Sequence, residues 1–183
     1  MRFFLLAPVL FGLSTMAQGL IDRQFPHLMV PIKQDAPSTV FGTVFTAEVS
    51  QVQGGGSRVL TEFIFDVPPH DATDCRLNFF INKDSPHAIW GDGDFYMHVH
   101  LLNGIPDKTK DTWNSHPGTG RLVATIKVTT DNQASIVDGG AVPCYKDETA
   151  NFIITPADPA KYGGFNWFEL DKPLHGLTYE MYK

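Results

Sequence analysis

The residues best suited to chemistry stand close together in the stretch GDGDFYMHVHLL, residues 91–102. His98 and His100 are separated by one residue, and Asp92 and Asp94 lie just upstream. Imidazole nitrogens can bind Zn²⁺ or Cu²⁺, at about 2.0–2.1 Å in the case of zinc. Alternate side chains of a strand share a face, so both histidines would lie on the same side, about 7 Å apart. The pair indicates either a metal site or the polar outer face of an ordinary strand.

A metal site at this pair needs a third ligand from another part of the chain. By residue type Asp92, His87 and His116 are candidates, but the sequence places none of them beside the pair. A calcium loop needs several spaced oxygen ligands and a closing Glu, and GDGD has no such frame. We interpret GDGD as a turn and favour the polar outer face, with a metal site at His98 and His100 as the alternative. No cofactor is expected.

Catalytic motifs are absent from the sequence. The Ser nearest to a Gly-flanked nucleophile elbow is Ser57 in GGGSRV, which is typical of a hairpin connection. Walker, Rossmann and HExxH motifs do not occur. Glycosidase chemistry needs two carboxylates across one bond, and the 20 acidic residues single out no pair. We assign no catalytic residue and favour a non-catalytic protein over an enzyme.

Aromatic side chains offer a different kind of site, because an exposed ring can stack on the face of a sugar. Trp113 lies in the polar loop KDTWNSHPGTG, and Trp90 and Tyr96 flank the GDGD turn. These three are our candidate ligand-binding aromatics. The alternative is that such rings pack in the core or at its edge, and we favour this alternative for Trp167.

The elements that must position these residues are short strands. Runs rich in Val, Ile, Thr and Phe are broken by Gly, Pro, Asp and Asn, and no window of twelve residues keeps a helical period. The predicted strands span 40–50, 58–67, 75–81, 94–102, 121–130, 134–138, 148–155, 165–170 and 176–182. Eight or nine such strands predict an all-β fold, a single antiparallel β-sandwich over residues 39–183.

Alternation within three of these runs predicts one buried face and one wet face. The predicted core-facing residues are Phe95, Met97, Val99 and Leu101, then Val59, Thr61, Phe63, Phe65 and Val67, then Leu122, Ala124, Ile126 and Val128. The opposite faces carry Tyr96, His98 and His100 in one run and Glu62 with Asp66 in another. We expect these five side chains to face solvent.

The first residues have the layout of a secretory signal peptide. Arg2 precedes an apolar run over 3–13, and small residues follow, with Thr15 and Ala17 before a cut at Gln18. The run is too short to cross a bilayer. We predict a signal peptide over 1–17 and a secreted, extracellular protein. Residues 18–38 hold three prolines and are predicted to form an extended N-terminal segment.

Cys75 and Cys144 are the two cysteines of the chain. In an oxidising compartment an even pair usually bonds, which predicts a disulfide. The bridge would close a loop of about 70 residues and contribute about 4 kcal/mol in the chain-entropy treatment. The alternative is two separate buried thiols.

Composition and charge limit the classes of partner that we expect for this protein. Hydrophobic residues make up 43% and charged residues 19% of 183, as in a globular domain. The formal net charge is −6 and basic residues do not cluster, which argues against nucleic acid and anionic membranes. No second apolar run suggests a membrane span.

The order of several motifs resembles the fungal But-two C-terminal domain family. These motifs are HLMVPI, FGTVFTAEVS, EFIFDVP, DCRLNFFI, GDGDFYMHVHLL, TWNSHPGTGRLVATIKV, VPCYKDETANFIITP and WFELDKPLHGLTYEMY. The similarity runs from about His27 to Tyr182 and is carried by the order of the motifs. It implies a β-sandwich, mostly secreted or at the cell surface, and Cys75 and Cys144 match the family's two cysteine positions.

The family resemblance implies little about activity. The family is named for a member that binds a subunit of a ubiquitin-like activating enzyme, a cytosolic activity that the predicted signal peptide argues against here. No catalytic motif comes with the family. His98 and His100 stand where the family usually has apolar or small polar residues, so they are a departure from its pattern.

These observations together predict a secreted fungal non-catalytic protein. It would act at the cell wall or host interface and bind a cell-wall polysaccharide, or a host or wall protein, through loop aromatics. One alternative is a metal-binding protein or metal-dependent enzyme that uses His98 and His100. The other is a structural wall component or effector without saccharide affinity.

Overall fold

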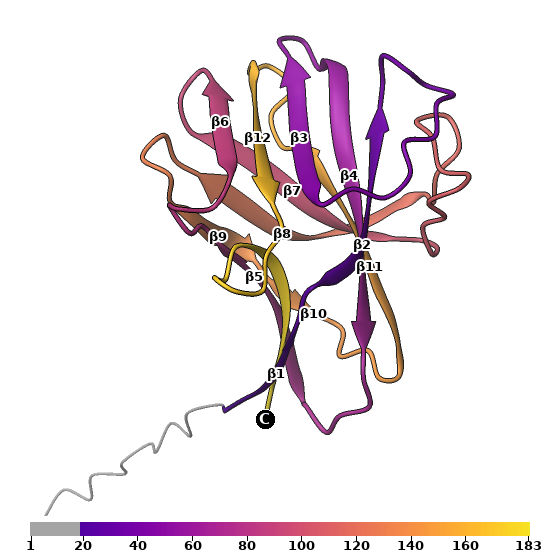
Figure 1. Ribbon diagram of the computed structural model, residues 1–183, viewed down its shortest axis with the longest axis vertical. Helices are drawn as coiled ribbons and strands as arrows, with labels where there is room; N and C mark the ends of the chain where they lie inside the picture. The colour runs from indigo at the N-terminus through magenta and orange to yellow at the C-terminus, as the bar shows by residue number, and fades with distance from the viewer. Residues whose placement is uncertain (1–18) are drawn as a thin grey trace, which may run out of the picture.

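The computed structural model describes residues 19–183, and every regular element in that range is a β-strand. Two antiparallel sheets pack face to face as a curled sandwich (Figure 1). The predicted all-β antiparallel sandwich is therefore confirmed. The predicted signal peptide, residues 1–17, lies outside the described residues. Within residues 19–183 no helix has the length and hydrophobicity needed to cross a membrane.

The smaller sheet has four strands and the larger sheet has nine. In spatial order the smaller sheet contains β1 (Leu20–Gln24), β13 (Gly176–Tyr182), β5 (Asp74–Phe80) and β10 (Ala141–Val142). The larger sheet contains β6 (His87–Gly91), β12 (Gly163–Phe168), β3 (Thr46–Val52), β4 (Gly56–Val67), β11 (Glu148–Pro156), β7 (Phe95–Leu102), β8 (Thr119–Val128) and β9 (Ala134–Gly139). Its ninth strand, β2 (Pro26–Lys33), pairs with β4 outside this order.

The N-terminal segment belongs to both sheets. β1 pairs with β13 in the smaller sheet, and β2 pairs with β4 in the larger one. Pro26 and Pro31 are tolerated in β2 because this strand pairs with β4 alone and leaves its other edge free of a ladder. The two ends of the described chain lie together, where the Lys183 amide donates to the Gly19 carbonyl at 3.1 Å.

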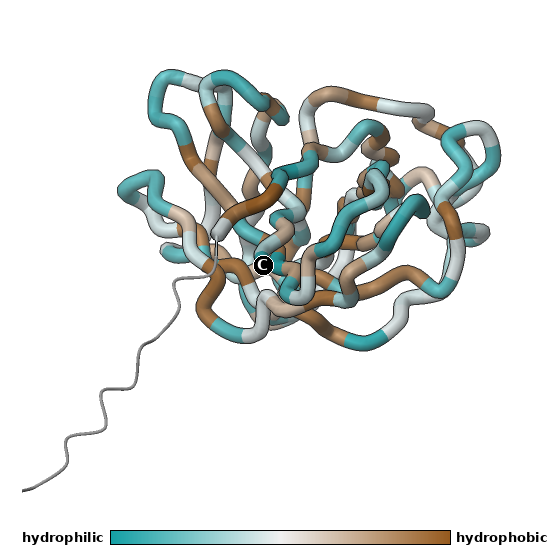
Figure 2. Tube along the Cα trace, turned by 90° about the horizontal axis from the view of Figure 1, so that it is seen from below, coloured by the Kyte–Doolittle hydropathy of each residue, from teal (hydrophilic) through white to brown (hydrophobic). Residues whose placement is uncertain are grey.

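An aromatic cluster joins the sheets. Trp167 of β12 is fully buried, as predicted, and stacks on Phe63 with ring centroids 5.9 Å apart. Phe79 of the smaller sheet meets the same indole edge-on at 5.0 Å. Each such pair contributes about 0.5–1.5 kcal/mol beyond its buried area. Figure 2 shows hydrophobic segments running through the interior while the outer loops are hydrophilic.

The predicted alternation holds on β7 and fails on part of β8. Phe95, Met97 and Val99 are buried as expected. Leu122, predicted to face the core, is 42% exposed, whereas Val123 is only 5% exposed. The cause is a bulge: Val99 lies opposite Ala124 while His100 lies opposite Leu122, so β8 holds one extra residue at Val123. The extra residue reverses which side chains face inward.

The prediction of a wet outer face on β4 is right for Asp66 and wrong for Glu62. The Asp66 side chain is well exposed, but Glu62 has no exposed surface. The long loop between β7 and β8, residues 103–118, covers this part of the face. A second apolar cluster there contains Ile32, Leu60 and Ile153, with Leu102 and Trp113 packed against it. Alternation identified the side of the strand, but not the loop that covers it.

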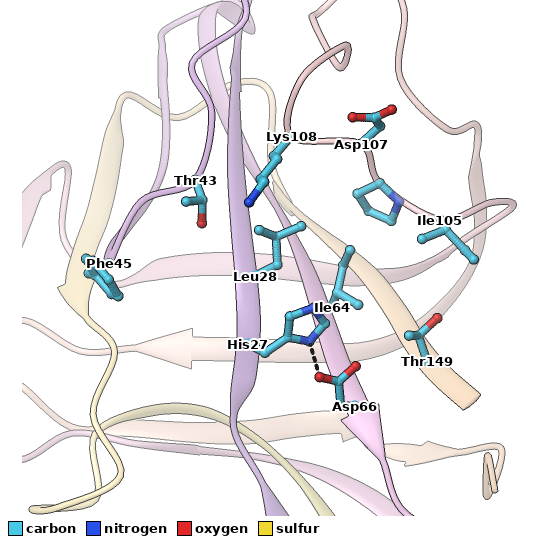
Figure 3. Close-up of a pocket in the computed structure, with 11 residues that line it drawn as sticks. His27, Leu28, Thr43, Phe45, Ile64, Asp66, Ile105, Asp107, Lys108 and Thr149 are labelled. Carbon is cyan, nitrogen blue, oxygen red and sulfur yellow. Dashed lines mark ion pairs between the residues drawn. The ribbon is translucent and has the colours of Figure 1, made fainter. Parts of the chain in front are cut away.

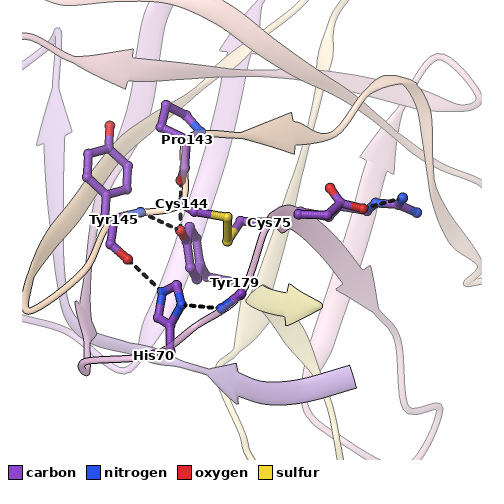
Figure 4. The surroundings of a disulfide bond; sticks show 9 residues. His70, Cys75, Pro143, Cys144, Tyr145 and Tyr179 are labelled. Carbon is purple, nitrogen blue, oxygen red and sulfur yellow. Dashed lines mark hydrogen bonds and ion pairs between the residues drawn. A yellow bond between two sulfur atoms is a disulfide. The ribbon is translucent and has the colours of Figure 1, made fainter. Parts of the chain in front are cut away.

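The predicted disulfide is present and ties β5 to the segment after β10. Cys75 and Cys144 are bonded, with their Cα atoms 5.2 Å apart, and the described residues contain no free cysteine. Beside the bridge, the Tyr179 hydroxyl donates to the Pro143 carbonyl at 2.7 Å and accepts the Tyr145 amide at 3.0 Å (Figure 4). Burial raises the pKa of Tyr179 to about 12, which keeps this hydroxyl protonated.

We expect that replacing both cysteines, Cys75→Ala with Cys144→Ala, lowers the free energy of unfolding by about 2–5 kcal/mol. The closed loop restricts the unfolded chain, so its loss favours unfolding. Urea denaturation followed by tryptophan fluorescence measures the effect. The control is a reductant, which should destabilise the wild type by the same amount and leave the double variant unchanged. Equal midpoints for wild type and variant would contradict the expectation.

The carboxyl group of Glu169 is the polar end of the aromatic cluster. Its Oε2 accepts the indole N–H of Trp167 at 2.8 Å and the amide of Leu177 at 3.2 Å, and its Oε1 is buried without a hydrogen-bond partner. Burial raises the pKa of Glu169 from 4.5 to about 8, despite these two donors. The folded chain therefore keeps a proton here over a range in which the unfolded chain has lost it.

This proton makes stability depend on pH. Because the folded pKa is raised, the contribution is complete below about pH 4.5 and is lost as the pH rises through about 8. Above pH 6.5 the free energy of unfolding should fall as the pH rises. His98 and His175 are neutral in this range, because their pKa values are lowered. We expect Glu169→Gln to reduce this fall by up to about 1.4 kcal/mol per pH unit. Urea denaturation of wild type and variant at pH 6.5, 7.25 and 8 measures the free energy of unfolding. The same dependence of this free energy on pH in both proteins would contradict the expectation.

Candidate functional site

His98 and His100 lie on the outer face of β7, as predicted. Both are half-buried, and their rings meet edge to face with centroids 5.9 Å apart. Burial lowers the pKa of His98, and the neighbouring His100 lowers it further. A neutral imidazole can bind a metal, so the lowered pKa of His98 keeps that ring able to act as a ligand.

The three candidate third ligands are not brought to this pair. Asp92 lies in the exposed turn before β7. His87 lies on β6 with its ring 5.4 Å from that of His175, and His116 lies in the loop 103–118 beside Glu62. Within residues 19–183, no group of three His, Cys, Asp or Glu side chains is placed to hold a metal ion. The metal site at His98 and His100 stays a prediction with two ligands.

The three candidate aromatics lie in three separate places. Trp113 is half-buried against the second apolar cluster, and Trp90 is half-buried on the edge strand β6. The ring of Tyr96 is flanked by the ammonium groups of Lys127 and Lys161, each 5.7 Å from its centroid. The fold does not join them into one surface, and their role in ligand binding stays a prediction.

A groove on the outer face of the larger sheet is a stronger candidate (Figure 3). Its floor is formed by β2, β4 and β11, and its walls by the loop 34–45 and the loop 103–118. Its volume is about 690 Å³, within the usual range for ligand sites. Its lining residues are His27, Leu28, Thr43, Phe45, Ile64, Asp66, Ile105, Pro106, Asp107, Lys108 and Thr149.

Two exposed apolar side chains stand on opposite sides of this groove. Phe45 is 74% exposed and Ile105 is 67% exposed, the highest values among the large apolar residues of the described chain. The ring of Phe45 stacks on that of Phe168, with centroids 6.2 Å apart, so its orientation is supported from below. Exposed apolar residues that flank a polar hollow are typical of a binding surface.

Sequence reasoning missed Phe45 because it lies inside the run 40–50, which was predicted as strand throughout. The strand β3 begins only at Thr46, and Phe45 stands in the loop before it. Residues 44–47, VFTA, continue the strand-like pattern across the start of β3. They therefore give no indication of where strand pairing begins. Only the position of the loop reveals that this phenylalanine faces solvent.

The floor of the groove combines apolar and polar side chains, with Leu28 and Ile64 beside His27 and Asp66. The Nδ1 atom of His27 lies 3.1 Å from an Asp66 carboxylate oxygen, which links β2 to β4. Lys108 extends from the loop 103–118 into the groove, and Thr149 presents its hydroxyl from β11. The groove therefore offers a carboxylate, an imidazole, an ammonium group and a hydroxyl between two apolar edges.

Two further hollows continue the groove at either end. One, of about 520 Å³, shares Asp66 and Thr149 with it and adds the acidic residues Asp147 and Glu148. The other, of about 240 Å³, shares Phe45 with it and extends to the loop after β12. We call the three adjoining hollows the trough. Its length suits an extended ligand better than a compact one.

The two walls of the trough are bonded to each other. The amide of Asn114 donates to the Pro37 carbonyl at 3.0 Å, which joins the loop 103–118 to the loop 34–45. At the base of the longer loop, the Asn103 amide donates to the Gly118 carbonyl at 2.8 Å. These contacts give the trough a defined shape without a bound ligand.

Comparison with known protein families places this fold. Residues 24–173 match the family described as the ubiquitin 3 binding protein But2 C-terminal domain. The match begins at the last residue of β1 and ends in the loop before β13, so it covers the larger sheet, the strands β5 and β10 of the smaller sheet and the whole trough. A search among curated proteins found no match. Because the family match covers well over half of its residues, the chain belongs to the But2 C-terminal domain family.

Proposed function

We propose that this protein is a secreted, non-catalytic β-sandwich that binds a polysaccharide at the fungal cell wall or host interface. The trough is the proposed binding site. The observation that carries the proposal is the groove on the outer face of the larger sheet, with the exposed residues Phe45 and Ile105 on its opposite sides and two adjoining hollows.

The form of the trough favours a polymer. The open groove over β2, β4 and β11 shares Asp66 and Thr149 with one neighbouring hollow and Phe45 with the other. A compact small molecule is usually enclosed on most sides. A linear chain can instead lie along an open hollow and make repeated weak contacts, which add up over several units.

The chemistry of the trough favours sugar units. The face of a pyranose ring is apolar and fits the exposed ring of Phe45, while its hydroxyl groups need polar partners. Carboxylates are strong acceptors for such hydroxyls, and Asp66, Asp147 and Glu148 line the trough. The excess of carboxylates over the ammonium group of Lys108 disfavours an anionic polymer.

The same surface is less suited to an extended peptide. Peptides commonly bind by adding a strand to a free sheet edge, where main-chain hydrogen bonds supply the affinity. The trough lies on a face instead. The nearest edge, β2, carries Pro31, which has no N–H, and its Met29 carbonyl already accepts the Val44 amide at 3.0 Å. The family description names a ubiquitin 3 binding protein, so a protein partner is the alternative that the experiment must distinguish.

Secretion is part of the proposal and has its own support. The apolar run 3–13 and the small residues before Gln18 match a signal peptide. The disulfide between Cys75 and Cys144 is the kind of bond that persists in an oxidising compartment.

We expect the purified, oxidised protein to be retained by insoluble chitin, β-1,3-glucan, cellulose or whole fungal walls in a sedimentation assay. Phe45→Ala should lower retention about tenfold, since it removes the ring on which a sugar would stack. The matched control is Tyr162→Ala, which removes an exposed aromatic side chain outside the trough and should leave retention unchanged.

Two results would contradict this proposal. One is equal retention of wild type and Phe45→Ala, which would place the sugar elsewhere. The other is no retention by any of the four materials. That result would favour a protein partner, or a structural wall component or effector without saccharide affinity.

A further inference from the structure

The contact between the loop 103–118 and the larger sheet contains two buried carboxyl groups and a half-buried histidine. Glu62 of β4 has no exposed surface, and Asp111 of the loop is 6% exposed. His116, also in the loop, has its Nδ1 atom 3.7 Å from Glu62 Oε1, outside hydrogen-bonding reach. Both carboxylate oxygens of Glu62 and the Nδ1 atom of His116 are buried without a hydrogen-bond partner.

The strands around Glu62 provide no countercharge. Across the sheet it lies opposite Val30 of β2 and Ile153 of β11, and these are apolar. On the far side of Ile153 in the sheet lies His100 of β7. Its Nδ1 atom is 3.3 Å from the Gly120 carbonyl oxygen. The titratable groups that face Glu62 therefore come from the loop, and they are Asp111 and His116.

This arrangement favours the protonated form of Glu62. Burial raises its pKa from 4.5 to about 8, and the negative charge of the nearby Asp111 acts in the same direction. When that proton is lost, two negative charges face each other in a buried contact. Even a protonated His116 balances only one of them.

The loop transmits a change at Asp111 directly to the trough. The amide of Asp107 donates to Asp111 Oδ2 at 2.7 Å, and the amide of Asp111 donates to the Asp107 carbonyl at 2.9 Å. Asp107 and its neighbours Ile105 and Lys108 form the trough wall. A displacement of Asp111 from the sheet therefore moves the residues that line the proposed binding site.

We propose that the loop 103–118 is a pH-sensitive wall: it packs on the sheet and forms one side of the trough while Glu62 carries a proton, and it leaves the sheet when Glu62 loses that proton. The trough then binds its polysaccharide in acidic and neutral solution and releases it in alkaline solution. The statement about the polysaccharide rests on the proposed function, whereas the loop movement does not.

The loop movement can be measured without any ligand. The chain has three tryptophans, so protein labelled with 5-fluorotryptophan has three ¹⁹F resonances, and Trp113→Phe assigns the one in the loop. We expect the Trp113 resonance of the wild type to shift between pH 6.5 and 9 with a midpoint near 8. In Glu62→Gln, which stays neutral, that shift should be absent. Asp138→Asn, which removes an exposed carboxylate on β9, is the control and should titrate as the wild type does.

A second variant keeps the test decisive if Glu62→Gln does not fold. In Asp111→Asn the repulsion at Glu62 is removed, while the amide oxygen can still accept the Asp107 amide. The midpoint of the Trp113 shift should then fall below the wild-type value. A Trp113 resonance that is constant between pH 6.5 and 9, or that titrates equally in wild type, Glu62→Gln and Asp111→Asn, overturns the proposal.

Retention on insoluble β-1,3-glucan and chitin over the same pH range tests the coupling. We expect retention of the wild type to fall about tenfold from pH 6.5 to 9, because about a tenth of Glu62 is still protonated at one unit above its midpoint. The Glu62→Gln variant should be retained equally at pH 6.5 and at pH 9. A normal Trp113 titration with no retention at any pH overturns only the proposed function. Retention that is independent of pH despite that titration overturns the coupling.

Discussion

The site depends on one constraint: the larger sheet carries an apolar patch on its outer face as well as an apolar inner face. Its inner face packs on the smaller sheet, so the apolar patch of Ile32, Leu60 and Ile153 on the outer face needs a separate cover. The loop 103–118 supplies this cover through Trp113, and in doing so it rises beside β2 and β4 as a wall. Covering the patch also takes Glu62 out of water next to Asp111. A pair of buried carboxylates is strongly unfavourable, and a retained proton removes half of the charge.

The rest of the molecule serves as a rigid platform for that wall. The aromatic cluster around Trp167 connects the two sheets, and the bridge between Cys75 and Cys144 ties the smaller sheet to the segment that leads into β11. β11 and β4 then run side by side under the trough. The trough therefore has a floor that belongs to the core and a wall that packs on it through Trp113. In the proposed switch, loss of the Glu62 proton would release this wall without disturbing the floor.

Much of the fold could be predicted from the sequence, since alternation and turn residues act locally. Nine strands, the buried Trp167, the inward face of β7 and the disulfide all follow from patterns within short stretches. What could not be predicted depends on segments far apart in the chain. Val123 reverses the alternation of β8 because of how that strand pairs with β7, and Glu62 is buried because a loop some fifty positions later lies over it. The trough itself combines six segments that are far apart in the chain, so no single motif identifies it.

The measurement that tests the central claim most directly is a map of where a soluble sugar binds. Titration of ¹⁵N-labelled protein with chito-oligosaccharides and β-1,3-gluco-oligosaccharides at pH 6.5, followed by two-dimensional NMR, gives this map residue by residue. The account predicts that the amide shifts concentrate along the trough, at Phe45, Asp66, Lys108 and Thr149, and that Trp90 and Tyr96 stay unchanged. Shifts centred on Trp90 or Tyr96, or no shifts with any of these sugars, would contradict it.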